Sequence, residues 1–159
     1  MPAPYKADAI ANEFLDGRLN KISPMKLQKL VYYAHAWSLG LFGEELVEEP
    51  IEAWPYGPVI PTLYHEFKGF GNRPVARMAI EIDDQLNKIH PRIDADDVRT
   101  AALIKRIWKL LGNRSAVALS NMTHAPNEPW AKIPVRSGGI RIPNKLIKKC
   151  FKKILSHDE

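Results

Sequence analysis

The stretch "SPMKLQKLVYYAHAWSLG", residues 23–40, has the clearest helical pattern in the chain. Ser23 is a favourable N-cap, and Pro24 suits the first helical position, where its missing N–H group costs nothing. The apolar side chains that follow recur at helical spacing: Leu27, Leu30, Val31, Ala34, Trp37 and Leu41. The second half is also poor in polar groups on its other side, which carries Tyr32, Tyr33, His35 and Leu39. A helix that is apolar nearly all round is usually buried, so we predict a buried central helix over residues 24–39 that stops at Gly40.

Segments on both sides of this helix have helical patterns and end signals of their own. They are residues 6–16 before Gly17, about 61–68 before Gly69, a segment from a cap at Asp94 or Asp96 to Gly112, one from Ser115 to Pro126, and one from a cap at Asn144. Strand patterns are few: an extended piece at 51–54, a strand-like "MAIEI" at 78–82 inside an irregular connection, and a turn or hairpin in "RSGGIRIP" at 136–143. We therefore predict a mainly α protein, a compact single-domain bundle of about five to six helices around a buried central helix, with at most a small strand pair, over residues 1–159.

Length and composition fit one soluble globular domain. The chain has 159 residues, 45% of them hydrophobic and 26% charged. Cys150 is the single cysteine, which excludes an intramolecular disulfide and suits a reducing compartment. The longest apolar stretch falls short of a membrane span, and the first residues lack the pattern of a secretory signal. We expect a cytoplasmic protein that does not contact the membrane.

Charge is distributed unevenly along the chain. Residues 1–80 hold 8 Lys or Arg and 9 Asp or Glu, whereas residues 81–159 hold 15 and 9. Five glutamates form an acidic run over residues 44–52, and seven basic residues lie between Arg136 and Lys153 without an acid. Such asymmetry affects the choice of a charged partner more than it affects the fold.

Three prolines at intervals of three mark "EAWPYGPVIPTLYHEF", residues 52–67. The interval is that of a polyproline II ligand, but the segment is bracketed by a glutamate-rich run and a helix rather than by disorder. We interpret the three prolines as having different backbone roles: Pro55 sets an extended entry, Pro58 leads into the helix after a turn at Gly57, and Pro61 lies in its first turn. The segment is then a rigid corner that holds Trp54, Tyr56 and Tyr64 beside the central helix, facing either the core or a partner.

Residues able to support catalysis are present without a recognisable arrangement. His35 and His65 are open to two interpretations, a proton-transfer pair in a cleft or polar tips hydrogen-bonded at the core edge, and we favour the second. Cys150 is either a thiolate favoured by neighbouring lysines or a small buried side chain, and again we favour the second. In "THAPNEPW" we expect Thr123 and His124 to bind helix-end carbonyls beneath Trp130. We predict no catalytic residues, no metal and no cofactor.

The last helix raises the possibility of nucleic-acid binding. Its lysines repeat on one side of an amphipathic pattern, at Lys145, Lys148, Lys149, Lys152 and Lys153. Such a side can neutralise phosphate charge, in which case binding weakens steeply with salt and on removal of the lysines. The same pattern is typical of a solvated helix face, so nucleic-acid binding or regulation through this helix is the alternative rather than the preferred function.

Three separated blocks resemble the Panacea antitoxin domain family, which includes SocA-like antitoxins and phage-associated GepA-like proteins. The blocks are "ISPMKLQKLVYYAHAWSL", "PIEAWPYGPVIPTLYHEFKGFG" and "SAVALSNMTHAPNEPW", spanning residues 22–130 in the order typical of the family, and the final "IPNKLIKKCF" is similar too. The resemblance implies a non-enzymatic antitoxin of a toxin–antitoxin module, which neutralises a protein toxin by direct binding. Some members of the family are proposed to act also as adaptors that deliver the toxin to a protease. Many relatives carry an additional DNA-binding module, which we do not expect here before Ile22.

The family motif and the usual chemistry of interfaces together give a set of candidate toxin-binding residues. Interfaces favour aromatic anchors, and lysines before the buried part of the central helix are placed to meet an acidic surface, while the acidic run at 44–52 would suit a basic toxin. The candidates are Lys26, Gln28, Lys29, Tyr32, His35, Trp54, Tyr56, Tyr64, His65, His124 and Trp130.

Overall fold

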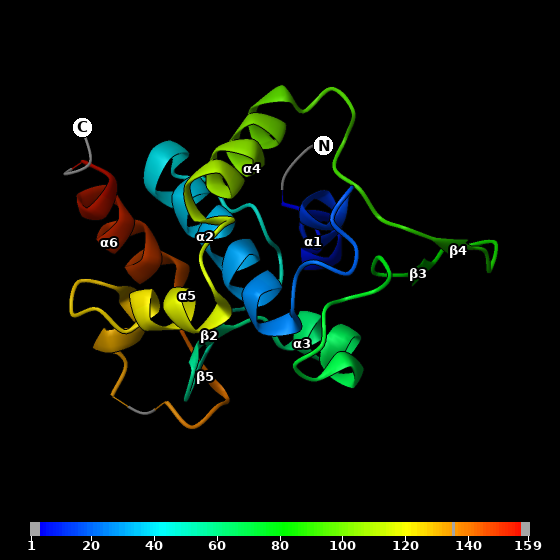
Figure 1. Ribbon diagram of the computed structural model, residues 1–159. Helices are drawn as coiled ribbons and strands as arrows, with labels where there is room; N and C mark the ends of the chain where they lie inside the picture. The colour runs from blue at the N-terminus through cyan, green and yellow to red at the C-terminus, as the bar shows by residue number, and fades with distance from the viewer. Residues whose placement is uncertain (1–3, 135, 157–159) are drawn as a thin grey trace.

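The computed structural model describes residues 4–134 and 136–156, and over this part of the chain it is mainly α. The helices are α1 (Ala7–Leu15), α2 (Pro24–Phe42), α3 (Pro61–Phe67), α4 (Val98–Leu111), α5 (Ala116–Thr123) and α6 (Asn144–Ser156), with 3-10 turns η1 (Lys68–Phe70) and η2 (Pro129–Lys132). Helix α2 runs through the middle, and α1, α4, α5 and α6 surround it (Figure 1). The prediction of a helical bundle around a buried central helix is confirmed.

The strands are short and form two small antiparallel sheets. In the first, β1 (Glu52–Trp54) lies between β2 (Gly57–Val59) and β5 (Ile140–Arg141). In the second, β3 (Glu81–Ile82) pairs with β4 (Lys88–Ile89). The "RSGGIRIP" segment was predicted as a turn or hairpin; its strand residue Ile140 pairs with Ala53 of β1, far away in sequence, rather than within the segment. The first sheet thereby ties the turn after β1 to the C-terminal part of the chain.

Helix α2 begins as predicted and ends later than predicted. The side chain of Ser23 accepts a hydrogen bond from the backbone N–H of Lys26, which completes the N-cap. The helix continues past Gly40 to Phe42, and Gly43 ends it in the left-handed conformation at φ 70°. Gly40 serves close packing instead, because a Cβ there would lie 2.8 Å from the Cβ of Phe151.

Two of the predicted N-caps differ from those in the structure. Helix α4 is capped by Asp97, whose carboxylate accepts from the N–H of Thr100, and not by Asp94 or Asp96. Asn144 lies inside α6, and its amide binds the side chains of His35 and Glu45 rather than its own helix. The cap at Ser115 is confirmed by its bond from the N–H of Ala118.

The seam between α2 and α6 forms the aromatic centre of the core. Tyr32, Tyr33 and Phe151 are nearly or completely buried and meet edge to face, with ring centroids 5.3 to 6.3 Å apart. Each such aromatic pair adds about 0.5–1.5 kcal/mol beyond the area it buries. The contact explains why the chain needs no polar side on the second half of α2.

Candidate protein-binding surface

Six of the candidate residues lie together on one surface of the molecule. We call this the aromatic surface; it comprises Trp54, Tyr56, Tyr64, His65, His124 and Trp130. It is built from the β1–β2 turn, α3, the end of α5 and η2, so residues from the second and third blocks of sequence meet in space.

Contacts between the rings hold the aromatic surface in shape. The rings of Trp54 and Tyr64 lie 5.0 Å apart, and that of Tyr64 lies 5.4 Å from His65. The indole N–H of Trp130 donates to the carbonyl oxygen of Trp54 at 2.7 Å. The imidazole of His124 stacks on Trp130 at 4.0 Å, which confirms that Trp130 covers this helix end.

Some of these aromatic side chains face the solvent and others are partly buried. Tyr56 is 68% exposed and Tyr64 is 42% exposed, and His65 is exposed as well. Trp54 and Trp130 are half-buried and support the others. Tyrosine is common among the anchor residues of protein interfaces, and a tyrosine on a fixed support loses little conformational freedom on binding.

The turn that presents Tyr56 requires a glycine at its next residue. Gly57 has φ +116°, and a Cβ there would lie 2.5 Å from the hydroxyl oxygen of Thr123. The hydroxyl of Ser120 donates to the carbonyl oxygen of Tyr56 at 2.6 Å. Helix α5 therefore supports the turn. The predicted bond of Thr123 to a helix-end carbonyl is confirmed, because its hydroxyl donates to the carbonyl oxygen of Ser120. The same prediction for His124 is not, since its Nε2 has no hydrogen-bond partner among the described residues.

The three prolines have different backbone roles, but only that of Pro61 is the predicted one: the turn lies at Pro55 and Tyr56 rather than at Gly57, which begins β2. Pro55 is exposed in the turn, and Pro58 is buried in β2. Pro61 occupies the first position of α3, as predicted. The period of three is thus a coincidence of separate backbone requirements.

Lys29 and Gln28 support the turn from within, and Lys29 does not lie on the surface as predicted. Lys29 is only 1% exposed, and its ammonium donates to the carbonyl oxygen of Pro58 at 2.9 Å. The amide of Gln28 is buried and binds both the N–H and the carbonyl of Ile60, at 2.9 and 3.2 Å. The interpretation of Lys29 as a surface cation for an acidic partner is therefore wrong, because its charge is enclosed by the protein.

Three further candidates also have intramolecular roles. Lys26 donates to the carbonyl oxygen of Gly112 and lies over the ring of Trp108, which joins α2 to the end of α4. His35 is buried and accepts on Nδ1 from the N–H of Val47, while its Nε2 contacts Asn144. Tyr32 is fully buried in the aromatic seam. These residues build the scaffold beneath the surface rather than the surface itself.

The structure separates the other residues considered for chemistry. His35 is hydrogen-bonded as expected but lies inside the core rather than at its edge, whereas His65 is exposed on α3, so the two do not form a pair. Burial lowers the pKa of His35 and raises that of the Cys150 thiol, so Cys150 is a buried apolar side chain as favoured. Residues 4–134 and 136–156 contain no group of three metal-binding side chains and no helix long and apolar enough to cross a membrane.

The acidic run at 44–52 is largely used within the chain. Glu44 pairs with Arg99, Glu45 binds Asn144, and Glu49 accepts from the N–H of Ala7. Glu52 accepts from the indole of Trp54 and the N–H of Gly139. Four of its five carboxylates thus have partners within the chain.

Sequence reasoning missed a buried acid beneath the third block. Glu128 is 7% exposed, and the hydroxyl of Tyr33 donates to one of its oxygens at 3.3 Å. Burial raises the pKa of Glu128 to about 7, and burial lowers the pKa of Lys29 to about 7. The only signal for Glu128 in the sequence is its position between Pro126 and Pro129, after the predicted end of a helix.

The shifted pKa values of Glu128 and Lys29 predict that the free energy of unfolding passes through a minimum near neutral pH. From the ordinary pKa of a glutamate to about 7, the folded state holds a proton on Glu128 that the unfolded state has lost, so stability falls as pH rises. From about 7 to the ordinary pKa of a lysine, the unfolded state holds the extra proton of Lys29, so stability rises with pH. Urea unfolding across this range measures both slopes.

Single substitutions separate the two slopes. Glu128→Gln is expected to reduce the acid-side slope and leave the alkaline side unchanged; the rest of the acid-side slope comes from Asp8, whose pKa is also raised by burial to about 7. Lys29→Met is expected to reduce the alkaline slope and leave the acid side unchanged. Lys152→Met, at an exposed position on α6, is the control and should leave the profile unchanged. An unchanged alkaline slope in Lys29→Met would contradict the assignment.

The described residues thus form a small helical scaffold that presents exposed tyrosines on a turn held by buried polar contacts. Comparison with known proteins specifies it further. The model of the family "Antitoxin SocA-like, Panacea domain" matches residues 27–131. Antitoxin SocA of Caulobacter vibrioides is 34% identical over 162 aligned residues, which cover 95% of this chain and 85% of that protein. The chain belongs to the SocA-like Panacea antitoxin family, and no solved structure matches it significantly.

Proposed function

We propose that this protein is the antitoxin of a toxin–antitoxin pair and neutralises a protein toxin by binding it directly, without catalysis. Membership of the SocA-like Panacea family supports the antitoxin role. The observation that carries the binding mechanism is the exposure of Tyr56 and Tyr64 on a turn held by buried polar contacts. Both tyrosines extend from a rigid support, so they suit anchoring in pockets of another protein.

The test is co-expression with the genes that lie beside this one. One neighbour is expected to stop growth when expressed alone and to permit growth with this protein, and the two products should co-purify. If every neighbour is harmless alone, or if a lethal neighbour is not suppressed, the proposal is wrong.

The same strains distinguish blocking from delivery to a protease. If neutralisation is by blocking, the toxin level after synthesis stops should be equal with and without this protein. If this protein is an adaptor, the toxin should disappear faster in its presence and persist in strains that lack the protease. We propose blocking as the basic activity, because the aromatic surface needs only a toxin to act.

Removing the exposed tyrosines should weaken toxin binding without unfolding the protein. Tyr56→Ala and Tyr64→Ala are each expected to raise the dissociation constant at least about tenfold, the usual effect of losing an interface anchor. Stability should change by no more than about 0.5 kcal/mol for Tyr56, which is the more exposed. Calorimetric titration with the purified toxin measures the first effect, and thermal unfolding the second.

Leu41→Ala is a matched control, since Leu41 is 49% exposed on α2 and outside the aromatic surface. Its toxin affinity should equal that of the wild type. Equal affinity in both tyrosine variants would show that toxin binding uses another part of the molecule.

A further inference from the structure

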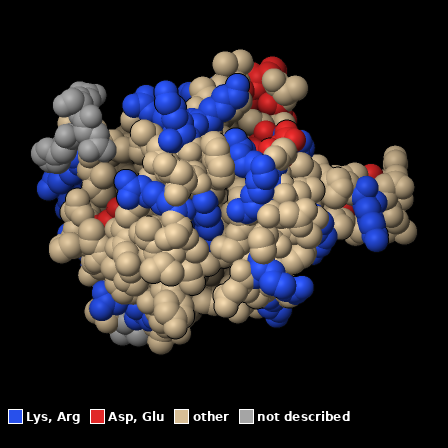
Figure 2. Space-filling model, in the orientation of Figure 1, with Lys and Arg blue, Asp and Glu red and all other residues tan. Residues whose placement is uncertain are grey.

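A hairpin over residues 80–90, which we call the arm, extends away from the helical body. It contains β3 and β4 and the turn between them, and Figures 1 and 2 show it standing clear of the rest of the molecule. Ile80, Glu81 and Asp83 are partly exposed, and all other residues of the arm are exposed. The arm therefore contributes little to the core.

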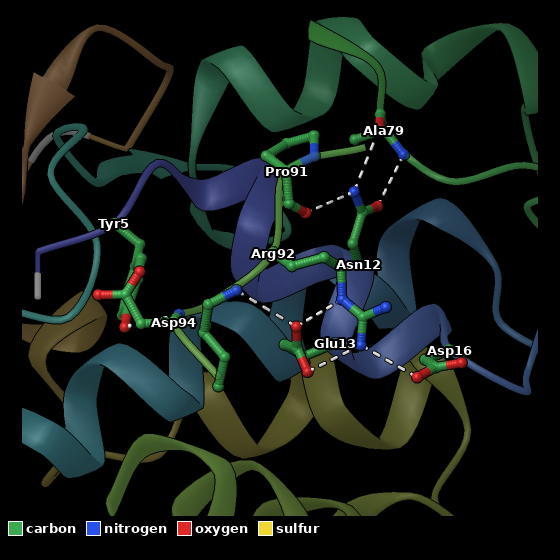
Figure 3. Close-up of polar contacts among 9 residues, drawn as sticks. Tyr5, Asn12, Glu13, Asp16, Ala79, Pro91, Arg92 and Asp94 are labelled. Atoms are coloured by element: carbon green, nitrogen blue, oxygen red, sulfur yellow. Dashed lines mark hydrogen bonds and ion pairs between the residues drawn. The ribbon is translucent and has the colours of Figure 1, made fainter. Parts of the chain in front are cut away.

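The base of the arm is nonetheless fixed by a fully buried asparagine. The amide oxygen of Asn12 accepts from the N–H of Ala79 at 2.7 Å. Its amide nitrogen donates to the carbonyl oxygens of Ala79 and Pro91, at 3.1 and 2.9 Å. One side chain of α1 thus holds the chain both where it enters the arm and where it leaves (Figure 3).

Ion pairs around the base restrict the arm further. Arg92 pairs with Glu13 of α1 and with Asp16, the residue that follows this helix (Figure 3). Lys6 pairs with Glu81 of β3 at 3.3 Å. Glu66 of α3 accepts from the N–H of Ile80 at 3.2 Å. Helix α3 also carries Tyr64 and His65, so it connects the arm with the aromatic surface.

The tip of the arm is ordered by hydrogen bonds that place a leucine in an unfavourable backbone conformation. The Oδ1 atom of Asp83 accepts from the N–H groups of Gln85 and Asn87, at 2.9 and 2.8 Å. Leu86, between them, has φ +64° and is 83% exposed. The left-handed conformation costs a leucine about 1–2 kcal/mol, and glycine or asparagine would avoid much of that cost.

Folding therefore gives no reason for a leucine at this position. The arm also exposes Ile82 by 57% and Ile89 by 41%. Ile82 pairs with Lys88 and Ile89 with Glu81, so the two isoleucines lie on opposite faces of the ribbon. Apolar groups on both faces and at the tip suit insertion into a groove better than contact with a flat surface.

Charge indicates the chemistry of that groove. Asp83 and Asp84 precede the leucine and Lys88 follows it, so the tip is acidic while the whole chain carries +5. Two arms meeting in a dimer would bring like charges together, whereas a groove with basic residues at its rim would complement the tip.

We propose that the arm is a second binding element for the toxin, and that it inserts Leu86, flanked by Ile82 and Ile89, into an apolar groove with a basic rim. This inference rests on the proposed antitoxin function. The ordered base means that the arm is held ready for binding, which lowers the entropy lost on association.

The deciding variants are Leu86→Gly and Leu86→Met, tested with the toxin identified by co-expression. Leu86→Gly removes the side chain and relieves the backbone, so stability should be unchanged or higher while toxin affinity falls at least about tenfold. Leu86→Met keeps an apolar side chain of similar volume and should retain affinity within about threefold. If Leu86 had only a structural role, Leu86→Gly would not lower toxin affinity while stability stayed the same or rose.

The control is Val117→Gly on α5, where the side chain is 66% exposed outside the arm; it is expected to lower stability slightly and leave affinity unchanged. If the wild type binds and neutralises the toxin and Leu86→Gly does so equally well, the arm proposal is overturned and the antitoxin function stands. If Leu86→Gly instead converts a dimer of this protein to a monomer with toxin affinity intact, the occupant is a second copy and the proposal is again wrong. If the wild type neutralises no neighbouring product, both proposals fail.

Discussion

Replacing Gly57 with alanine is expected to destabilise the protein by roughly 2–5 kcal/mol and to weaken toxin binding. The new methyl group would meet the hydroxyl oxygen of Thr123 at 2.5 Å and the ammonium of Lys29 at 3.1 Å. The backbone at φ +116° is also unfavourable for alanine. Strain and overpacking each cost about 1–3 kcal/mol, and relief of either one moves the turn that presents Tyr56. Urea unfolding measures the stability loss.

Gly69→Ala is the matched control for this substitution. No heavy atom lies within 4 Å of a Cβ built on Gly69, and its φ is not positive. Its stability should stay within about 0.5 kcal/mol of the wild type. A loss below about 1 kcal/mol in Gly57→Ala would mean that the turn is less tightly enclosed than the contacts indicate.

Phe151→Ala is expected to lower the free energy of unfolding by about 3–5 kcal/mol, the usual cost of removing a buried aromatic ring. Phe151 is 1% exposed and packs between Tyr32, Tyr33 and Gly40. The cavity would open in the seam between α2 and α6, where neither helix backbone can move far without losing its other contacts. Thermal or urea unfolding of the purified variant measures the loss.

The neighbouring residue supplies the control. Lys152 is exposed on the same helix, and Lys152→Ala should change stability by less than about 0.5 kcal/mol. If Phe151→Ala loses less than about 2 kcal/mol, the surrounding rings have collapsed into the space, and the seam is more adaptable than its packing suggests.

The fold was predictable because its main element is encoded locally. The N-cap at Ser23 and the apolar surface of α2 are properties of neighbouring residues, so the sequence indicated a buried central helix. The stop at Gly40 was wrong because the need for glycine there comes from Phe151, more than a hundred residues away. The role of Asn144 was missed for the same reason, since His35 and Glu45 lie far from it in sequence.

The candidate surface was predictable in part, because its residue types were visible and their exposure was not. Tyr56 and Tyr64 face solvent, as an anchor requires, whereas Lys29 is buried although a lysine is seldom fully enclosed. The acceptor that permits its burial is the carbonyl of Pro58, a backbone group that no side-chain pattern reveals. The arm was predicted as an irregular connection, because two-residue strands have no measurable period.

The hydrogen bonds of Asn12 leave the sequence of the arm free to change during evolution. All three of its bonds go to main-chain atoms, those of Ala79 and Pro91, and none goes to a side chain between them. Mutations from Ile82 to Ile89 therefore leave the attachment intact and scarcely touch the core. The tip can diversify while the scaffold is inherited unchanged, so a new partner can be acquired through substitutions that selection for folding does not oppose.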